Sequence, residues 1–324
     1  MKPLRVLAAL LVLTASCSFP RSGSDAGPTA AASLTQAPSA TATLTPSPSP
    51  SSTPAPSPTP SPSPTAACLE IHGRVDEVSY PGLLVHRDIP VRVYLPPCYS
   101  SSRRSYPVLY LLHGLPFTES HWDDLGADEV ADEAIAAGEW VQFLIVMPFQ
   151  PQPLFGSTDG GEGSYEQEFL EGLVPFIDRN YRTDPQPGAR ALAGISRGGV
   201  WALEIGLRHP DMFGGVGALS PALSANSARP EFDPLDIVAQ GDPFPDRIYL
   251  GAGDRDWARR LTVSLANDLG EAGAKLMLAI VPGGHQTEVW TRLLRPMMSY
   301  LVTPWRVLTG PERKMLLLEE GLAE

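Results

Sequence analysis

The chain has 324 residues and a formal net charge of −12, and 43 % of its residues are hydrophobic, which excludes a wholly disordered chain. No basic stripe interrupts the acidic excess, so the chain lacks the footprint that nucleic-acid phosphates require. Twelve of the 35 prolines fall within residues 18–66, where Arg21 and Asp25 are the only charged side chains. About 250 residues of ordinary globular composition remain, enough for one sizeable core.

Residues 1–16 have the pattern of a secretory signal peptide. Lys2 and Arg5 precede an apolar run at residues 6–13, and small residues follow before Cys17. The run is too short to cross about 30 Å of hydrocarbon. A cysteine at this place resembles a bacterial lipobox, in which the thiol takes a diacylglyceryl group. We expect an exported lipoprotein that faces the extracellular or periplasmic side and meets the membrane only through Cys17. An ordinary signal peptide is the alternative.

Residues 17–66 form a tether in this interpretation. Proline largely alternates with Ser or Thr from residue 45 to residue 64, which favours an extended polyproline II spacer without a core of its own. Two further cysteines, Cys68 and Cys98, lie near the start of the globular part. An even pair in an exported protein suggests a disulfide, with two free thiols as the alternative.

Residues 67–303 alternate between strand-like and helix-like segments, which predicts a mostly parallel, doubly wound α/β sheet. We expect strands at residues 91–95, 108–112, 143–147, 191–193, 216–219, 248–250 and 276–281. We expect helices at residues 127–137, 166–180, 198–208, 257–272 and 287–301. Residues 304–324 form a tail that has no functional interpretation and includes a short helix-like run. Ligands of such sheets bind at the carboxyl ends of the strands.

Gly194-Ile195-Ser196-Arg197-Gly198 stands between a predicted strand and a predicted helix. This is the context of the G-x-S-x-G nucleophile elbow, in which a strained turn exposes the serine oxygen above the sheet. The flanking glycines avoid clashes between the turn and its neighbours. Ser196 is therefore the candidate nucleophile.

A serine nucleophile needs a histidine base, and the histidine needs an acid to orient it. His285 follows the strand predicted at 276–281 within a Gly-Gly-His loop, which suits the chain order serine, acid, histidine. The acid is expected after the strand predicted at 248–250, where Asp254 and Asp256 are both available. The general rule does not separate these two aspartates.

The oxyanion of the tetrahedral intermediate needs two N–H donors. The backbone of Arg197, directly after the nucleophile, supplies one. The second is expected from the loop after the strand at 108–112, where Leu115 is the natural donor because Pro116 has no N–H.

These residues carry a family resemblance. The motifs are Val93-Tyr94-Leu95-Pro96-Pro97, Tyr110-Leu111-Leu112-His113-Gly114, Gly194-Ile195-Ser196-Arg197-Gly198-Gly199, Gly251-Ala252-Gly253-Asp254 and Gly283-Gly284-His285. The chain resembles the putative-esterase family of α/β-hydrolases, which includes feruloyl esterases, enterochelin esterases, S-formylglutathione hydrolases and mycolyltransferases. The resemblance implies the α/β-hydrolase fold and supports Leu115 as donor. It also favours Asp254 as the acid, with Asp256 as the alternative, because the family acid stands three residues after the first glycine of its loop.

We expect an exported, lipid-anchored serine carboxylesterase that forms an acyl-enzyme on a small-molecule, glycan or lipid ester. Transfer of the acyl group to a sugar or lipid hydroxyl is the first alternative, and a non-catalytic binding protein on a hydrolase scaffold is the second. Trp122 is a candidate for the substrate pocket, with a place in the core as the alternative. No cluster has metal-ligand spacing, so neither a metal nor an organic cofactor is expected.

Overall fold

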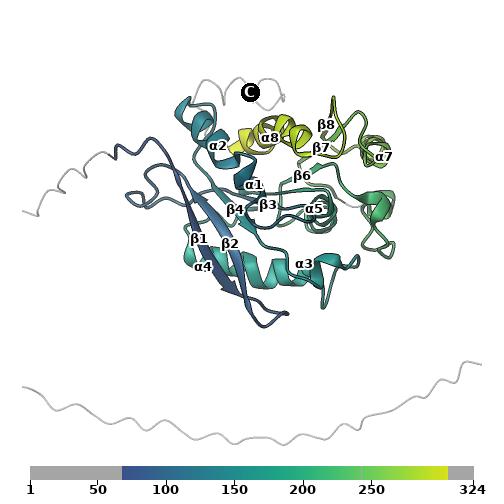
Figure 1. The fold of residues 1–324 in the computed structure, drawn as a ribbon, viewed down its shortest axis with the longest axis horizontal. Helices are drawn as coiled ribbons and strands as arrows, with labels where there is room; N and C mark the ends of the chain where they lie inside the picture. The colour runs from purple at the N-terminus through teal and green to yellow at the C-terminus, as the bar shows by residue number, and fades with distance from the viewer. Residues whose placement is uncertain (1–67, 242, 306–324) are drawn as a thin grey trace, which may run out of the picture. The chain divides into compact units, whose positions relative to one another are not determined.

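The computed structural model describes residues 68–241 and 243–305, and an eight-stranded sheet runs through this part of the chain (Figure 1). The strands are β1 (Arg74–Pro81), β2 (Asp88–Leu95), β3 (Val108–Leu112), β4 (Leu144–Pro148), β5 (Arg190–Ile195), β6 (Gly215–Leu219), β7 (Arg247–Gly253) and β8 (Leu276–Val281). Their order across the sheet is β1-β2-β4-β3-β5-β6-β7-β8. β2 is antiparallel to both of its neighbours, and the strands from β4 to β8 pair in parallel. The predicted fold class is confirmed.

The central strands owe their place to continuous apolar runs. β3, β4, β5 and β6 are buried at every position, as expected for strands covered on both faces. β1 was not predicted, because its sequence mixes charged and apolar residues and it pairs only at the edge of the sheet. β7 is longer than its prediction, since it continues through the apparent loop residues Gly251–Gly253.

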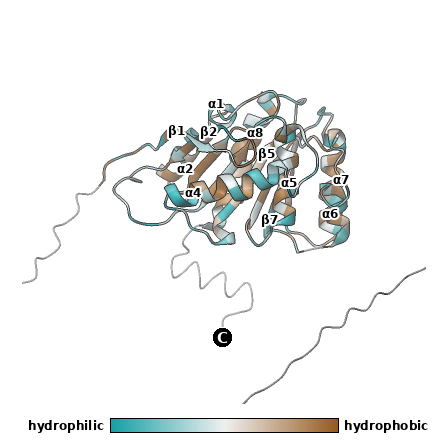
Figure 2. Ribbon diagram, turned by 90° about the horizontal axis from the view of Figure 1, so that it is seen from below, coloured by the Kyte–Doolittle hydropathy of each residue, from teal (hydrophilic) through white to brown (hydrophobic). Residues whose placement is uncertain are grey.

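Helices cover both faces of the sheet. They are α1 (His121–Asp124), α2 (Ala127–Ala136), α3 (Tyr165–Gln167), α4 (Val174–Asn180), α5 (Arg197–Arg208), α6 (Pro234–Gln240), α7 (Arg259–Glu271) and α8 (Thr287–Val302), with a π-helical segment at Glu168–Leu173 joining α3 to α4. One hydrophobic cluster joins α1, α2 and α8 to the sheet, and two others join α3 to α7 to the opposite face. Figure 1 shows α2 and α8 on one side and α3 and α4 on the other. Figure 2 shows hydrophobic residues concentrated on the strands between these layers.

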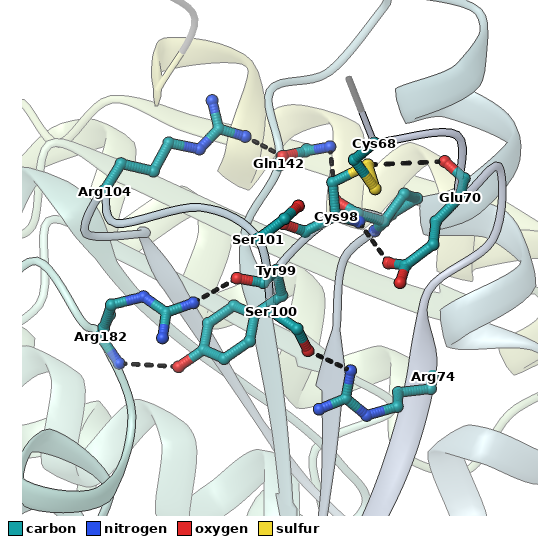
Figure 3. The surroundings of a disulfide bond; sticks show 11 residues. Cys68, Glu70, Arg74, Cys98, Tyr99, Ser100, Ser101, Arg104, Gln142 and Arg182 are labelled. Carbon is teal, nitrogen blue, oxygen red and sulfur yellow. Dashed lines mark hydrogen bonds between the residues drawn. A yellow bond between two sulfur atoms is a disulfide. The ribbon is translucent and has the colours of Figure 1, made fainter. Parts of the chain in front are cut away.

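A disulfide joins Cys68 to Cys98, with their Cα atoms 5.7 Å apart, which confirms the predicted pairing. It ties the segment before β1 to the loop after β2. Figure 3 shows that Glu70 reinforces the junction, because its carboxylate accepts the N–H of Cys98 at 2.7 Å. On the other side of the loop, the hydroxyl of Tyr99 accepts the N–H of Arg182 at 2.9 Å.

The predicted signal peptide, Cys17, the tether and residues 306–324 lie outside the described residues. Among the helices that the structure describes, none combines the length and the apolar character needed to cross a bilayer.

Candidate active site

The turn between β5 and α5 holds Ser196 in the strained conformation that a nucleophile elbow requires. Ser196 has φ 54° and ψ −115°, outside the regions that non-glycine residues favour. A Cβ on Gly194 would lie 2.1 Å from the carbonyl oxygen of Gly198. A Cβ on Gly198 would lie 2.3 Å from the carbonyl oxygen of His113. Both motif glycines are therefore required by close backbone approach.

Ser196, His285 and Asp256 form a chain of hydrogen bonds at the carboxyl ends of β5, β7 and β8. The Oγ atom of Ser196 lies 3.0 Å from Nε2 of His285. The other ring nitrogen, Nδ1, lies 2.9 Å and 3.2 Å from the two carboxylate oxygens of Asp256. Along the chain His285 is 29 residues from Asp256 and 89 residues from Ser196, so only the fold brings the three side chains together.

The preference for Asp254 over Asp256 was wrong, because Asp256 is the residue that contacts His285. β7 extends to Gly253, so Asp254 still pairs with β8 and donates its N–H to the carbonyl of Val281 at 2.8 Å. Its carboxylate is half exposed and accepts the N–H of Gly283. The turn that follows then directs Asp256 inward, where its carboxylate is fully buried. The prediction counted three residues from Gly251 as the first residue of the loop. It failed because Gly251 lies inside β7 and the loop begins only after Gly253.

The environment of Asp256 favours its ionised form. Burial alone would raise the pKa of this carboxyl, but hydrogen bonds from His285, from the hydroxyl of Ser220 and from the N–H of Ala258 hold it below its ordinary value. The Ala258 bond measures 2.8 Å. An ionised acid at Nδ1 fixes the tautomer in which Nε2 is free to accept the proton of Ser196.

The two predicted oxyanion donors come from loops that meet at Ser196. A Cβ on Gly114 would lie 3.3 Å from Cβ of Ser196, so the loop after β3 passes directly beside the nucleophile. Arg197 is the first residue of α5, where a helical N–H has no partner within the helix. Across residues 68–241 and 243–305, neither Leu115 nor Arg197 donates its backbone N–H to another group. Both are thus available to a developing oxyanion.

A buried histidine holds the loop after β3 in place. Nδ1 of His113 lies 3.0 Å from the carbonyl oxygen of Gly114, and Nε2 accepts the N–H of Gln150 at 3.0 Å. Burial lowers the pKa of His113 to about 4, so the ring is neutral at physiological pH. A neutral ring with one donor and one acceptor satisfies both contacts.

Two tryptophans contact His285, and the sequence analysis gave neither of them a role there. Trp257 packs against the imidazole with ring centroids 4.5 Å apart and is 52 % exposed. Trp290 meets the imidazole edge-on at 5.3 Å. Trp122 is fully buried in the core, so of its two predicted places the core is confirmed and the substrate pocket is not. The position of Trp257 directly after Asp256 is the one sequence signal that pointed to it.

Within the described residues, Cys68, Glu70 and Cys98 form a group with the spacing of metal ligands. Both sulfur atoms belong to the disulfide, so the group lacks the thiolates that bind a soft metal.

The sheet order, the elbow and the three hydrogen-bonded side chains at the strand ends are those of an α/β-hydrolase fold. A model of the putative esterase family matches residues 84–303, and the chain belongs to that family. The match spans every residue of the hydrogen-bonded chain.

Individual relatives agree with this membership. A xylanase/feruloyl esterase of Xylanibacter ruminicola is 30 % identical over 240 residues, which cover 71 % of this chain and 31 % of the relative. An esterase of Mycobacterium tuberculosis is 34 % identical over 127 residues, covering 37 % of this chain and 26 % of the relative. The chain thus spans about a third or less of these two proteins. A solved ferulic acid esterase shares the fold with a TM-score of 0.65 and 24 % identity, over 72 % of this chain and 99 % of that one.

Proposed function

We propose that the protein is a serine carboxylesterase in which Ser196, His285 and Asp256 act as nucleophile, base and acid. The observation that carries the proposal is the continuous contact from Ser196 Oγ through both ring nitrogens of His285 to the buried carboxylate of Asp256. A non-catalytic binding protein has no need for this order of groups, nor for a strained nucleophile beside two available N–H donors.

The reaction proceeds in two halves. Ser196 Oγ attacks the ester carbonyl carbon while Nε2 of His285 takes its proton, and the N–H groups of Leu115 and Arg197 stabilise the oxyanion. The intermediate collapses, the C–O bond breaks, and His285 gives the proton to the leaving alcohol. Water, deprotonated by His285, then attacks the acyl-enzyme, and Ser196 leaves with the proton restored. Transfer to another hydroxyl would follow the same steps with an alcohol in the place of water.

The proposed substrate is an ester of an aromatic acid such as ferulate. Relatives named feruloyl esterase support this class. Flat apolar surface is also exposed beside His285, since Trp257 packs against its ring and is 52 % exposed. Phe117, whose ring centroid lies 6.1 Å from that of Trp290, is 36 % exposed. A planar aryl group gains more from such surfaces than a flexible aliphatic chain does, because fewer rotatable bonds are immobilised.

We further propose that the protein is exported and anchored by a lipid on Cys17. The Cys68–Cys98 disulfide supports an oxidising compartment. The order of basic residues, apolar run, small residues and cysteine supports the anchor.

Ser196→Ala tests the catalytic proposal. We expect hydrolysis of p-nitrophenyl acetate and methyl ferulate to fall by about 10³-fold or more, because no other group supplies the nucleophile. Ser101→Ala, at an exposed serine after the disulfide, is the matched control and should keep full activity. Equal turnover by wild type and Ser196→Ala would contradict the proposal.

A further inference from the structure

The turn after β3 sets the direction of the Leu115 N–H, one of the two donors assigned to the oxyanion. This N–H shares a planar peptide unit with the carbonyl of Gly114, and in this trans unit the two groups point in opposite directions. The carbonyl accepts the N–H of Phe117 at 2.9 Å and lies 3.0 Å from Nδ1 of His113. The contacts that hold residues 114–117 therefore decide where the Leu115 N–H points.

His121 holds this turn at both of its ends. Nδ1 of His121 accepts the N–H of Gly114 at 3.4 Å. The imidazole also stacks on the ring of Phe117, with centroids 3.7 Å apart and an angle of 2° between the planes. The backbone N–H of His121 donates to the carbonyl of Thr118, directly after the turn, at 3.1 Å. One residue therefore fixes the first and the last residue of the turn relative to each other.

The helix α1 gives His121 a rigid base. His121 is the first residue of this helix and is 2 % exposed. The next residue, Trp122, is fully buried in the hydrophobic cluster that joins α1, α2 and α8 to the sheet. Asp123 forms an ion pair with Arg92 of β2. The helix is thus attached to the sheet, so the imidazole is a fixed point against which the turn is held.

Packing alone does not explain a histidine at position 121. Because Nδ1 is the acceptor for Gly114, the hydrogen of the neutral ring lies on Nε2. Burial lowers the pKa of His121 to about 4, which keeps the ring neutral at physiological pH. Within residues 68–241 and 243–305, Nε2 has no hydrogen-bond partner, and an unpaired buried N–H destabilises a fold. Phenylalanine would stack on Phe117 without that cost, but it would offer Gly114 no acceptor.

We propose that His121 is a positioning residue that holds the turn at residues 114–117 so that the N–H of Leu115 points at the oxyanion. The proposal rests on the proposed function, since it concerns a donor for the same reaction. His121 acts through Gly114 and Phe117 and does not touch the reacting atoms. Because the oxyanion forms only as the reaction proceeds, a well-placed donor speeds the chemical step and leaves substrate binding unchanged.

Two substitutions separate the acceptor from the ring. His121→Phe keeps a stacked ring and fills the same space, but it offers no acceptor to Gly114. His121→Asn keeps an acceptor oxygen close to the place of Nδ1 and loses the ring. A buried ring contributes more to stability than one long hydrogen bond does. We therefore expect His121→Phe to melt at a higher temperature than His121→Asn.

Activity should rank the two variants in the opposite order. Removing a whole oxyanion donor lowers kcat by about 10²-fold to 10³-fold, and a displaced donor costs less. We therefore expect kcat on methyl ferulate to fall about 10-fold to 100-fold in His121→Phe, with KM within about twofold of wild type. His121→Asn should lose less. A kcat of His121→Phe equal to or above that of His121→Asn would overturn the proposal, because activity would then follow stability or the ring alone.

A serine-reactive fluorophosphonate distinguishes failure of this inference from failure of the proposed function. When the reagent reacts with Ser196, its phosphoryl oxygen takes the place of the oxyanion, and Ser196→Ala gives the background. We expect His121→Phe to be labelled about 10-fold or more slowly than wild type. Equal labelling rates would overturn the role of His121 and leave the proposed function standing. A wild type that is not labelled above the background would overturn both.

Discussion

Half of the strained non-glycine residues in the described part of the chain lie in the turns of the candidate site. Among the described residues, four non-glycine side chains have positive φ, namely His86, Cys98, Ser196 and Ser220. Two of the four lie in the hydrogen-bonded network of the site. Such conformations persist only where the surroundings enforce them. Here the enforcing contacts are N–H bonds from Ser196 to Leu219 and from Ser220 to Gly251, which tie both turns to the sheet.

The two aspartates of the β7 turn give a matched pair of variants. Asp256→Asn should lower kcat by about 10³-fold to 10⁴-fold, because an amide cannot stabilise the charged imidazole and favours the wrong tautomer. Asp254→Asn should retain activity within about threefold, because the amide oxygen can still accept the N–H of Gly283. Kinetics on methyl ferulate check both, with circular dichroism as the folding control. Greater loss in Asp254→Asn than in Asp256→Asn would contradict the assignment.

Single residues differ in how far the sequence determines their roles. Ser196 and His285 were predicted because local patterns specify them: glycines clear space around the elbow, and a glycine loop follows β8. Asp256 was only the alternative, because the choice depends on where β7 stops pairing with β8. That point is set by contacts between strands and not by the local sequence. The contact of Trp257 with His285 likewise arises from two turns that are distant in the chain.

At the scale of elements, α5 joins the nucleophile to the loops around it. The side chain of Arg197 donates to the carbonyl oxygens of Phe155 and Ser157 and to the side-chain oxygen of Asn226. Burial lowers the pKa of this guanidinium to about 10, which leaves it charged in the physiological range. The backbone N–H of Arg197 is therefore available beside Ser196, while its side chain holds the loops after β4 and β6 together.

The same helix buries an acid that the mechanism does not use. Glu204 is fully buried, and within the described part of the chain its two oxygens have no hydrogen-bond partner. Burial, aided by the charge of Glu166, raises the pKa of Glu204 to about 9 from an ordinary value of 4.5. Between these values the unfolded chain releases a proton that the folded protein keeps. Stability is therefore lost as pH rises from about 4.5 to about 9.

Glu204→Gln should remove this loss, because glutamine has nearly the same shape and no charge. We expect the variant to match wild type near pH 4 and to exceed its unfolding free energy at pH 8 by about 4–5 kcal/mol, since each pH unit above 4.5 costs the wild type about 1.4 kcal/mol. Urea titrations at both pH values measure the difference. Glu162→Gln, at an exposed position, serves as the control and should change neither value. A pH-independent difference between Glu204→Gln and wild type would contradict this account.

Whole elements were predicted where one pattern dominates. The buried strands β3 to β6 and the amphipathic helices α5 and α8 follow from apolar runs and helical periodicity. β1 and the short helix α1 were missed, since tertiary contacts stabilise them more than their own sequence patterns do. α6 was missed although its sequence signals it: Asp233 caps its N-terminus, Pro234 is its first residue and Gly241 follows its end. The missed elements lie outside the strand ends that carry Ser196, His285 and Asp256, so the candidate site could be predicted without them.

At the scale of the molecule, the disulfide and the hydrogen-bonded side chains of the candidate site lie at opposite ends of the sheet. Ser196, Asp256 and His285 follow the carboxyl ends of the parallel strands β5, β7 and β8. β2 runs antiparallel to β4, so the loop after β2, which contains Cys98, lies at the amino ends of those strands. The disulfide and the start of the described chain at Cys68 are therefore at the opposite end of the sheet from Ser196.

This separation predicts that the disulfide contributes to stability and not to turnover. The bridge joins residues 30 positions apart, and closing a loop of that length stabilises the fold by about 3–4 kcal/mol in the chain-entropy model. The double variant Cys68→Ser/Cys98→Ser should therefore melt about 10 °C lower than wild type. Its kcat at 25 °C should stay within about twofold, because no residue of the reacting site contacts the bridge.

Calorimetry with and without a reducing agent gives the control. Reduction should lower the melting temperature of the wild type to that of the double variant and should leave the double variant unchanged. Equal melting temperatures of oxidised wild type and double variant would show that β1 is held by its pairing with β2 alone. A large fall in kcat at 25 °C would instead mean that the amino end of the sheet transmits strain to Ser196, contrary to the separation that the strand order implies.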